Sequence, residues 1–206
     1  MNRKISETGR KKLITKEEYN QILNLAESNF RDYALLSLIG HYGLRVGEVV
    51  RLRIQDINAK AKTINIPTLK RDKNRTGTIK KGKLPESYIL FPLPQNDIIG
   101  LVRYISHYGI KEGWLFKWSS GSHLPEERAK NIFYRYAKQI GVNASIHSLR
   151  HLRGSTIYEE TMQIRMVQIA LRHKSISSSM VYTEPTLEMI SKILKPIGEK
   201  GATILQ

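Results

Sequence analysis

Two arginines, two histidines and a tyrosine stand in an order that suits the transfer of a phosphoryl group. Arg45 follows Gly-Leu, His147 and Arg150 are three residues apart, and Tyr182 lies nine residues after His173. When a phosphodiester is attacked, the phosphate becomes more negative, and two guanidinium groups can bind its non-bridging oxygens through charged, forked donors. A tyrosine hydroxyl can form a covalent phosphate ester, and histidines can transfer protons. Together these residue types fit phosphodiester transesterification, with cationic side chains in place of a metal ion.

The same reaction needs two further contributions. A tyrosine phenol has an ordinary pKa of about 10, so nearby positive charge or a base must assist its attack at neutral pH. The leaving 5′ oxygen needs a proton, which a lysine on a mobile loop can donate. A basic stretch over residues 69–85, rich in lysine, arginine and glycine, could provide that lysine.

Each of these clusters also has a plain structural explanation when it is taken alone. Arg45 could be a solvated arginine at a helix corner, and residues 147–151 could form a polar helix face. Tyr182 is one of ten tyrosines and could simply be packed. A zinc ion bound by His147 and His151 is a further alternative, although no carboxylate pattern of the kind found on metalloprotease helices accompanies the pair.

The composition favours a nucleic acid partner. The 206 residues include 34 Lys plus Arg and 18 Asp plus Glu, which gives a formal net charge of +16. A field of this sign attracts polyanions, and phosphate contacts dominate the energetics of nucleic acid binding. Cysteine is absent, which excludes disulfides and thiolate chemistry. No apolar stretch reaches the roughly 18–20 residues that span a bilayer, and a membrane-surface protein is only a remote alternative. We expect a cytoplasmic protein.

Helices are expected to position most of these residues. Thr15 and Glu18 form a capping-box pattern that predicts a helix to about residue 28, with Ile22, Leu25 and Ala26 facing inward. Polar and apolar residues alternate over 62–67, and 88–93 is typical of a returning strand. The fold class is therefore mainly α with a small antiparallel β-sheet (α+β). Further helices are predicted over about 31–42, 46–52, 95–107, 126–140, 148–160, 163–171, 177–182 and 187–195.

In their joint order, these clusters resemble the tyrosine recombinase family, also called the phage integrase or Xer-like family. The likeness covers residues 13–194. Its first arginine box is matched by Gly-Leu-Arg-Val-Gly-Glu at 43–48, and its second by His-Ser-Leu-Arg-His at 147–151. Its Leu-Gly-His motif, followed nine residues later by a tyrosine, is matched by Leu-Arg-His at 171–173 and Tyr182.

The resemblance implies a role for each matched residue. Arg45 and Arg150 would bind the scissile phosphate, while His147 and His173 would assist proton transfer and orient the phosphate. Tyr182 would become linked to the DNA 3′ phosphate and free a 5′ hydroxyl. Neither a metal nor another cofactor is implied.

Several further residues receive supporting roles from the same resemblance. Glu48 is similar to the acidic residue that braces the site, and His151 would support it. The lysine is expected in the turn after the second strand, where Lys70 fits best. Four other lysines remain open: Lys73, Lys80, Lys81 and Lys83. DNA contacts are expected from Lys73, Arg75, Lys80, Lys81 and Arg172. Arg172 stands where the family has glycine, and it either adds a third cation to the site or demands a different backbone.

The resemblance implies the catalytic domain of a site-specific DNA recombinase or integrase that acts on double-stranded DNA. Residues 1–12 would be a basic tail, 13–195 the catalytic domain and 196–206 a C-terminal tail, with the family's N-terminal DNA-clamp domain absent. We expect a monomer in isolation and a tetramer on paired DNA sites. A virus, plasmid or other mobile element of a prokaryote is the expected source.

Two alternatives stay open from the sequence. One is a DNA-binding regulator that kept the fold and lost the reaction. The other is a tyrosine-type topoisomerase, which would relax supercoiled DNA without sequence preference.

Overall fold

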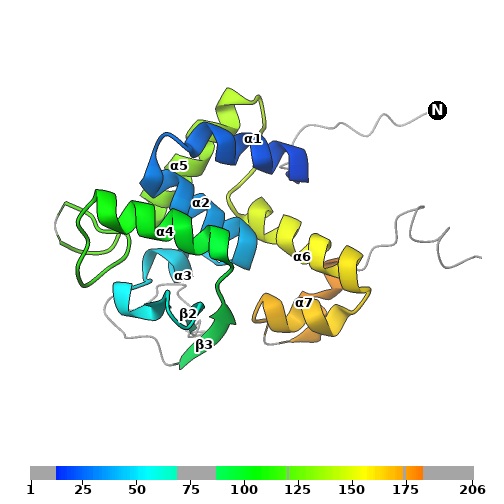
Figure 1. The fold of residues 1–206 in the computed structure, drawn as a ribbon. Coiled ribbons are helices and arrows are strands. Elements are labelled where there is room, and N and C mark those ends of the chain that lie inside the picture. Colours follow the sequence, from blue (N-terminus) through cyan, green and yellow to red (C-terminus); the bar gives the residue numbers. More distant parts are fainter. Residues whose placement is uncertain (1–12, 69–86, 120, 174, 183–206) are drawn as a thin grey trace, which may run out of the picture.

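The computed structural model describes residues 13–68, 87–119, 121–173 and 175–182, and this part of the chain is mainly helical with a small sheet (Figure 1). The predicted fold class is confirmed. The α-helices are α1 Lys16–Ala26, α2 Phe30–Tyr42, α3 Val46–Val50, α4 Gln95–His107, α5 Glu126–Gln139, α6 His147–Thr161 and α7 Ile164–Ala170. The strands are β1 Ile57–Asn58, β2 Thr63–Thr68 and β3 Ser87–Pro92, and short 3-10 turns span Ile54–Asp56, Ile176–Ser178 and Met180–Tyr182. The predicted helix over 187–195 lies outside the described residues.

Local capping chemistry sets the start of the first helix. The Thr15 hydroxyl accepts a hydrogen bond from the Glu18 amide at 3.1 Å, and the Glu18 carboxylate accepts one from the Thr15 amide at 2.9 Å. This is the reciprocal arrangement of a capping box. Ile22 and Ala26 are fully buried as predicted, but the prediction for Leu25 is wrong, because 41% of its surface is exposed.

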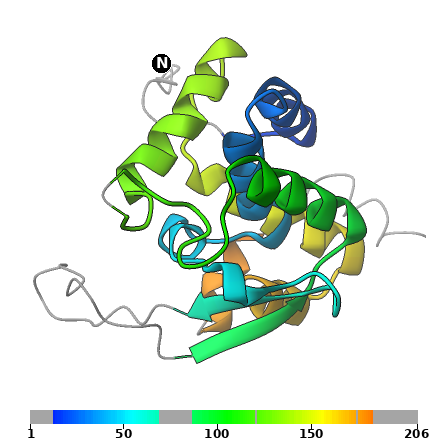
Figure 2. The same cartoon turned by 60° about the vertical axis from the view of Figure 1, so that its left-hand side comes forward.

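The sheet has the order β1-β2-β3, and both pairs of strands are antiparallel. Ile64 lies opposite Phe91 and Ile66 opposite Ile89, and both β2 isoleucines are fully buried. Alternate side chains of a strand face opposite sides, so the predicted alternation placed this strand correctly. β1 was not predicted, because a strand of two residues is too short to show an alternating pattern. The sheet lies under the helices, along the lower side of the molecule in Figure 2.

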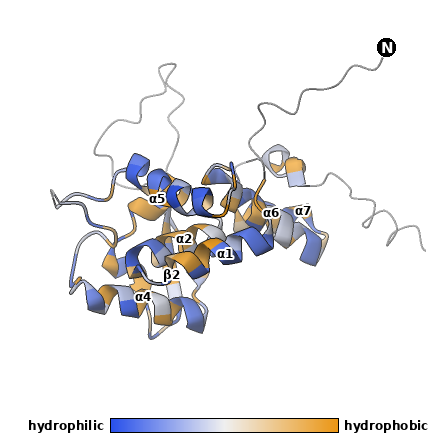
Figure 3. Cartoon of the chain, turned by 90° about the horizontal axis from the view of Figure 1, so that it is seen from above, coloured by the Kyte–Doolittle hydropathy of each residue, from blue (hydrophilic) through white to orange (hydrophobic). Residues whose placement is uncertain are grey.

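Helix α2 lies at the centre of the helical layer and touches α1, α3, α4, α5 and α6. Its Leu35, Leu36, Leu38 and Ile39 are buried. The surrounding helices α4 and α5 carry both hydrophilic and hydrophobic residues, as amphipathic helices that cover a core do (Figure 3). A second, smaller apolar cluster joins α6 and α7 and contains Ile157, Val167, Leu171 and Tyr182. No helix among the described residues is long and apolar enough to cross a membrane.

A buried carboxylate joins the C-terminal end of α2 to the first turn of α4. Asp97 is 2.8 Å from His41 Nδ1 and accepts hydrogen bonds from Tyr42 at 2.9 Å and from Ser37 at 3.3 Å. Burial opposes ionisation of this carboxyl group, but the bonds from its three partners outweigh burial and hold the Asp97 pKa below its ordinary value. The network therefore anchors the end of α2, from which the chain enters the 43–48 corner.

Asp97→Asn is expected to destabilise the fold by about 1–3 kcal/mol at pH 7, because one amide cannot satisfy all three partners. A carboxyl group whose pKa is lowered by folding stabilises the fold above its unfolded pKa, about 3.9, and this contribution disappears as the pH falls through its folded pKa. Thermal unfolding measured from pH 7 to pH 3 should therefore show that the difference in stability between wild type and variant becomes smaller below about pH 4. Glu112→Gln, an exposed change of the same kind, is the control. A stability difference that stays the same at low pH would contradict the stabilising role of the ionised Asp97.

Candidate active site

The corner between α2 and α3 holds the first arginine. Gly43 has a left-handed φ of 56° that ends α2 and turns the chain toward Arg45. Arg45 Nη1 donates to Glu48 Oε1 at 2.8 Å, and the Arg45 amide donates to Glu48 Oε2 at 2.8 Å. Glu48 is fully buried, whereas 35% of the Arg45 side chain is exposed. The carboxylate thus anchors a guanidinium that still reaches solvent.

The second arginine links three segments of the chain. Arg150 lies on α6, is buried, and donates hydrogen bonds to the carbonyl oxygens of Gly43 and Leu171. Burial, followed by the charges of Arg45 and Arg172, lowers the Arg150 pKa to about 9. The guanidinium therefore stays charged at neutral pH, and it brings the 43–48 corner, α6 and the end of α7 together.

Tyr182 lies beside this cationic group. Its ring is 6.2 Å from the His173 ring in a stacked arrangement and 5.5 Å from the His151 ring, measured between centroids. The tyrosine is only 8% exposed. Burial raises the Tyr182 pKa, and the positive charges of Arg150 and then Arg45 act in the opposite direction. The phenol therefore lies within the field of both arginines, which offsets part of the rise in pKa that burial causes.

His173 is held by a neighbouring serine. Its Nδ1 is 2.8 Å from the hydroxyl oxygen of Ser179, which is fully buried. Burial, followed by the charges of Arg150 and Arg45, lowers the His173 pKa to about 4. The imidazole is therefore neutral at pH 7.

The two histidines of the 147–151 cluster lie on α6 in different surroundings. His147 is the exposed first residue of the helix. His151 is partly buried, packs against the Tyr182 ring, and has its pKa lowered by burial and then by the charge of Arg150. His151 thus supports the tyrosine ring, while His147 lies one turn earlier on the same face of α6, at the exposed start of the helix.

Arg172 is buried, not exposed to a partner. Its backbone has a left-handed φ of 56°, and its side chain is 1% exposed. Its Nη2 donates to Glu48 Oε2 at 2.9 Å. The expectation that Arg172 contacts DNA is therefore corrected, because its guanidinium is enclosed and bound to protein acceptors. Arg172 is therefore a third cation beside the site, and its backbone adopts the left-handed conformation that glycine takes readily.

The comparisons with known proteins agree with this arrangement. Residues 12–189 match the phage integrase family. The chain belongs to the phage integrase family. The tyrosine recombinase XerA of Pyrococcus horikoshii is 25% identical over 89% of this chain and 60% of its own length. The crystal structure of a XerA recombinase has a TM-score of 0.71 at 19% identity, covering 90% of this chain and 64% of the other. A XerH recombinase bound to its difH substrate has a TM-score of 0.68 at 23% identity, covering 90% and 54%.

The chain spans about 60% of the length of the XerA relative. The solved structures confirm the fold of the catalytic domain. The basic stretch that follows β2 lies outside the described residues. The assignments to Lys70, Lys73, Arg75, Lys80, Lys81 and Lys83 therefore stay predictions.

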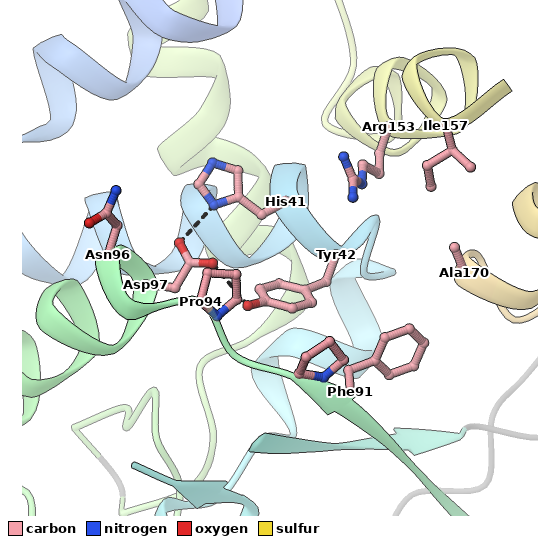
Figure 4. A pocket seen from close by; sticks show the side chains of 10 residues that line it. His41, Tyr42, Phe91, Pro94, Asn96, Asp97, Arg153, Ile157 and Ala170 are labelled. Carbon is pink, nitrogen blue, oxygen red and sulfur yellow. Dashed lines mark hydrogen bonds and ion pairs between the residues drawn. The ribbon is translucent and has the colours of Figure 1, made fainter. Parts of the chain in front are cut away.

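A hollow of about 400 Å³ is lined by Tyr42 and Arg153 among others, and none of the candidate catalytic residues that the structure describes lines it. Figure 4 shows Arg153 and Ile157 of α6 on one side of it, Phe91 on another, and His41 with Asp97 at its edge. The hollow therefore borders the site without forming part of it.

Two residues that support the site were not singled out from the sequence. Ser179 binds His173, and Gly154 of α6 lies under the Tyr182 ring. A Cβ atom at Gly154 would stand 2.5 Å from Cε1 and 2.6 Å from Cζ of that ring. A glycine inside a predicted helix was the available signal, since glycine there lowers helix stability and often marks close packing.

Gly154→Ala is expected to destabilise the fold by about 1–3 kcal/mol, because the added methyl group must displace the tyrosine ring. In a protein that already carries Tyr182→Ala, Gly154→Ala should instead stabilise the fold. The space is then open, and alanine favours an α-helix over glycine by about 1 kcal/mol. Thermal unfolding of the two single variants, the double variant and wild type measures this cycle. Equal effects of Gly154→Ala in both backgrounds would show that the ring does not pack on Gly154.

Proposed function

We propose that this chain is the catalytic domain of a site-specific DNA recombinase that cleaves and rejoins strands through a covalent 3′-phosphotyrosyl intermediate. One observation carries the proposal: Tyr182 lies beside the rings of His151 and His173, within the field of both Arg45 and Arg150. A packed structural tyrosine needs no such surroundings. Membership of the phage integrase family supports the same reaction.

The geometry supports a defined sequence of bond changes. Arg45 and Arg150 bind the non-bridging oxygens of the scissile phosphate and stabilise the charge that develops on them. The phenol proton leaves as Tyr182 attacks phosphorus, and His147 and His173 are the candidate groups for this proton transfer. The P–O5′ bond breaks, and the leaving 5′ oxygen takes a proton from the loop lysine, for which Lys70 is the first candidate. Because the ester bond to tyrosine replaces the broken phosphodiester, rejoining can proceed by the reverse steps without a nucleotide.

Double-stranded DNA is the proposed partner. The net charge of +16 favours a polyanion, and the XerH neighbour was solved with its difH substrate. A monomer in isolation and a tetramer on paired sites remain the proposed assembly states. A cytoplasmic location and a mobile-element origin complete the proposal, and structural neighbours include a transposon integrase and a mycobacterium phage integrase.

The test is capture of the covalent intermediate. Duplexes that bind the protein are first selected from a randomised pool, and nicked suicide substrates are then made from them. We expect an adduct that survives denaturant and is sensitive to protease. Tight, sequence-selective binding without any adduct would instead support a regulator. Relaxation of supercoiled plasmid without sequence preference would support a topoisomerase.

A further inference from the structure

Arg172 combines three features that each cost stability. Its φ of 56° places a side chain in the left-handed region, its guanidinium is 1% exposed, and its Nε is buried without a hydrogen-bond partner in the part of the chain that the structure describes. Glycine at this position would avoid all three, because it adopts a positive φ without a Cβ clash. The family pattern has glycine here. Buried ion pairs are themselves weak evidence for stability, so another reason for the arginine is needed.

The Arg172 guanidinium bonds to two helix ends that are far apart in the sequence. Nη1 donates to the carbonyl oxygens of Tyr42 at 3.2 Å and Ala170 at 2.9 Å. Nη2 donates to the carbonyl oxygen of Gly43 at 3.1 Å. The guanidinium also lies 5.4 Å from the centroid of the Phe91 ring. One planar group therefore ties the end of α2 to the end of α7 and rests on β3.

Arg172 also shares one hydrogen-bond acceptor with Arg45 and another with Arg150. Glu48 gives Oε1 to the Arg45 side chain and Oε2 to Arg172. The Gly43 carbonyl oxygen accepts from both Arg150 and Arg172. Glu48 Oε2 accepts from Arg172 and from the Arg45 amide, so among the described residues the Arg45 guanidinium bonds to Glu48 through Oε1 alone and keeps further donors for a phosphate. The next residue in the chain is His173.

From this geometry we infer that Arg172 is a positioning residue, which holds Arg45, Arg150 and the turn bearing His173 in the arrangement that receives the phosphate. It acts through Glu48 and the Gly43 carbonyl and does not itself touch DNA. The inference deepens the proposed strand-transfer function and rests on it. The pKa of His173 agrees with this geometry. Burial lowers it most, followed by the charges of Arg150, Arg45 and then Arg172.

Two variants separate the shape of the guanidinium from its charge. Arg172→Gly removes both and restores the residue typical of the family, whereas Arg172→Lys keeps the charge and loses the planar fork. Arg103→Gln removes one cation from the exposed face of α4 and is the control. Thermal unfolding establishes that each variant is folded at the assay temperature.

The first measurement is the rate of adduct formation on the suicide substrate. We expect losses of about 10- to 100-fold for both Arg172 variants, since displacement of a positioned group by about 1 Å can cost 100-fold, and no loss for Arg103→Gln. The second is titration of His173 by NMR, which needs no DNA. The His173 pKa should rise in Arg172→Gly and remain near its low value in Arg172→Lys.

Wild-type adduct formation by Arg172→Lys, or a wild-type His173 titration in a folded Arg172→Gly, would overturn the inference. If Arg172→Gly does not fold, the rate measured for Arg172→Lys decides. If wild type forms no adduct, the proposed function fails. In that case the titration still decides whether Arg172 acts on His173.

Discussion

Tyr182→Phe is expected to abolish the covalent adduct while leaving salt-sensitive DNA binding largely intact. The phenylalanine ring keeps the packing on Gly154 and against His151 and His173, and only the attacking oxygen is lost. Removal of a nucleophile typically lowers turnover by about 10⁶-fold, so the adduct should fall below detection on the suicide substrate. Denaturing electrophoresis measures the adduct, and retention on labelled duplex at several salt concentrations measures binding.

Tyr158→Phe is the matched control, because Tyr158 is a partly buried tyrosine that packs against the same apolar cluster. It should form adduct as wild type does. A persistent adduct in Tyr182→Phe would assign the nucleophile to another tyrosine, which peptide mapping of the DNA-linked fragment would identify. Loss of binding in step with loss of adduct would instead indicate that the hydroxyl serves binding or folding.

Arg150→Lys is expected to reduce adduct formation by about 10²–10³-fold, the range found when one donor to a developing oxyanion is removed. Lysine keeps a positive charge but has no planar fork, so it cannot donate to Gly43 and Leu171 in the present geometry and also to a phosphate. A carbonyl oxygen left without its partner should also cost about 1–3 kcal/mol of stability. Single-turnover rates and thermal unfolding, measured on the same preparations, separate the two effects.

Arg153→Lys provides the control on the same helix. Arg153 lines the hollow of Figure 4, and the Cβ and Cγ atoms that it places near Gly43 are also present in lysine. Its adduct rate should remain that of wild type. If Arg150→Lys cleaves at the wild-type rate, the phosphate is bound without the Arg150 fork. If both variants lose activity equally, the loss is not specific to the Arg150 fork.

Most of the helices could be predicted because their signals lie within a few residues. The capping box at Thr15, the glycine that ends α2 and the alternation around Ile64 each act locally, and each was confirmed. The prediction failed where tertiary packing decided the outcome. Leu25 is exposed although its position in the helix suggested burial, since the neighbours of α1 cover only part of its apolar face.

The sequence by itself determined the fold class, the family and the order of the candidate catalytic residues, because helix caps, strand periods and motif spacings are written in short segments. Only the tertiary structure decided how those residues meet. It packed the Tyr182 ring on Gly154, gave His173 the Ser179 hydroxyl as a partner, and turned Arg172 inward to Glu48, 124 residues away in the chain. No local rule predicts such a contact, because it forms only when α2, α3 and α7 have packed around one buried carboxylate.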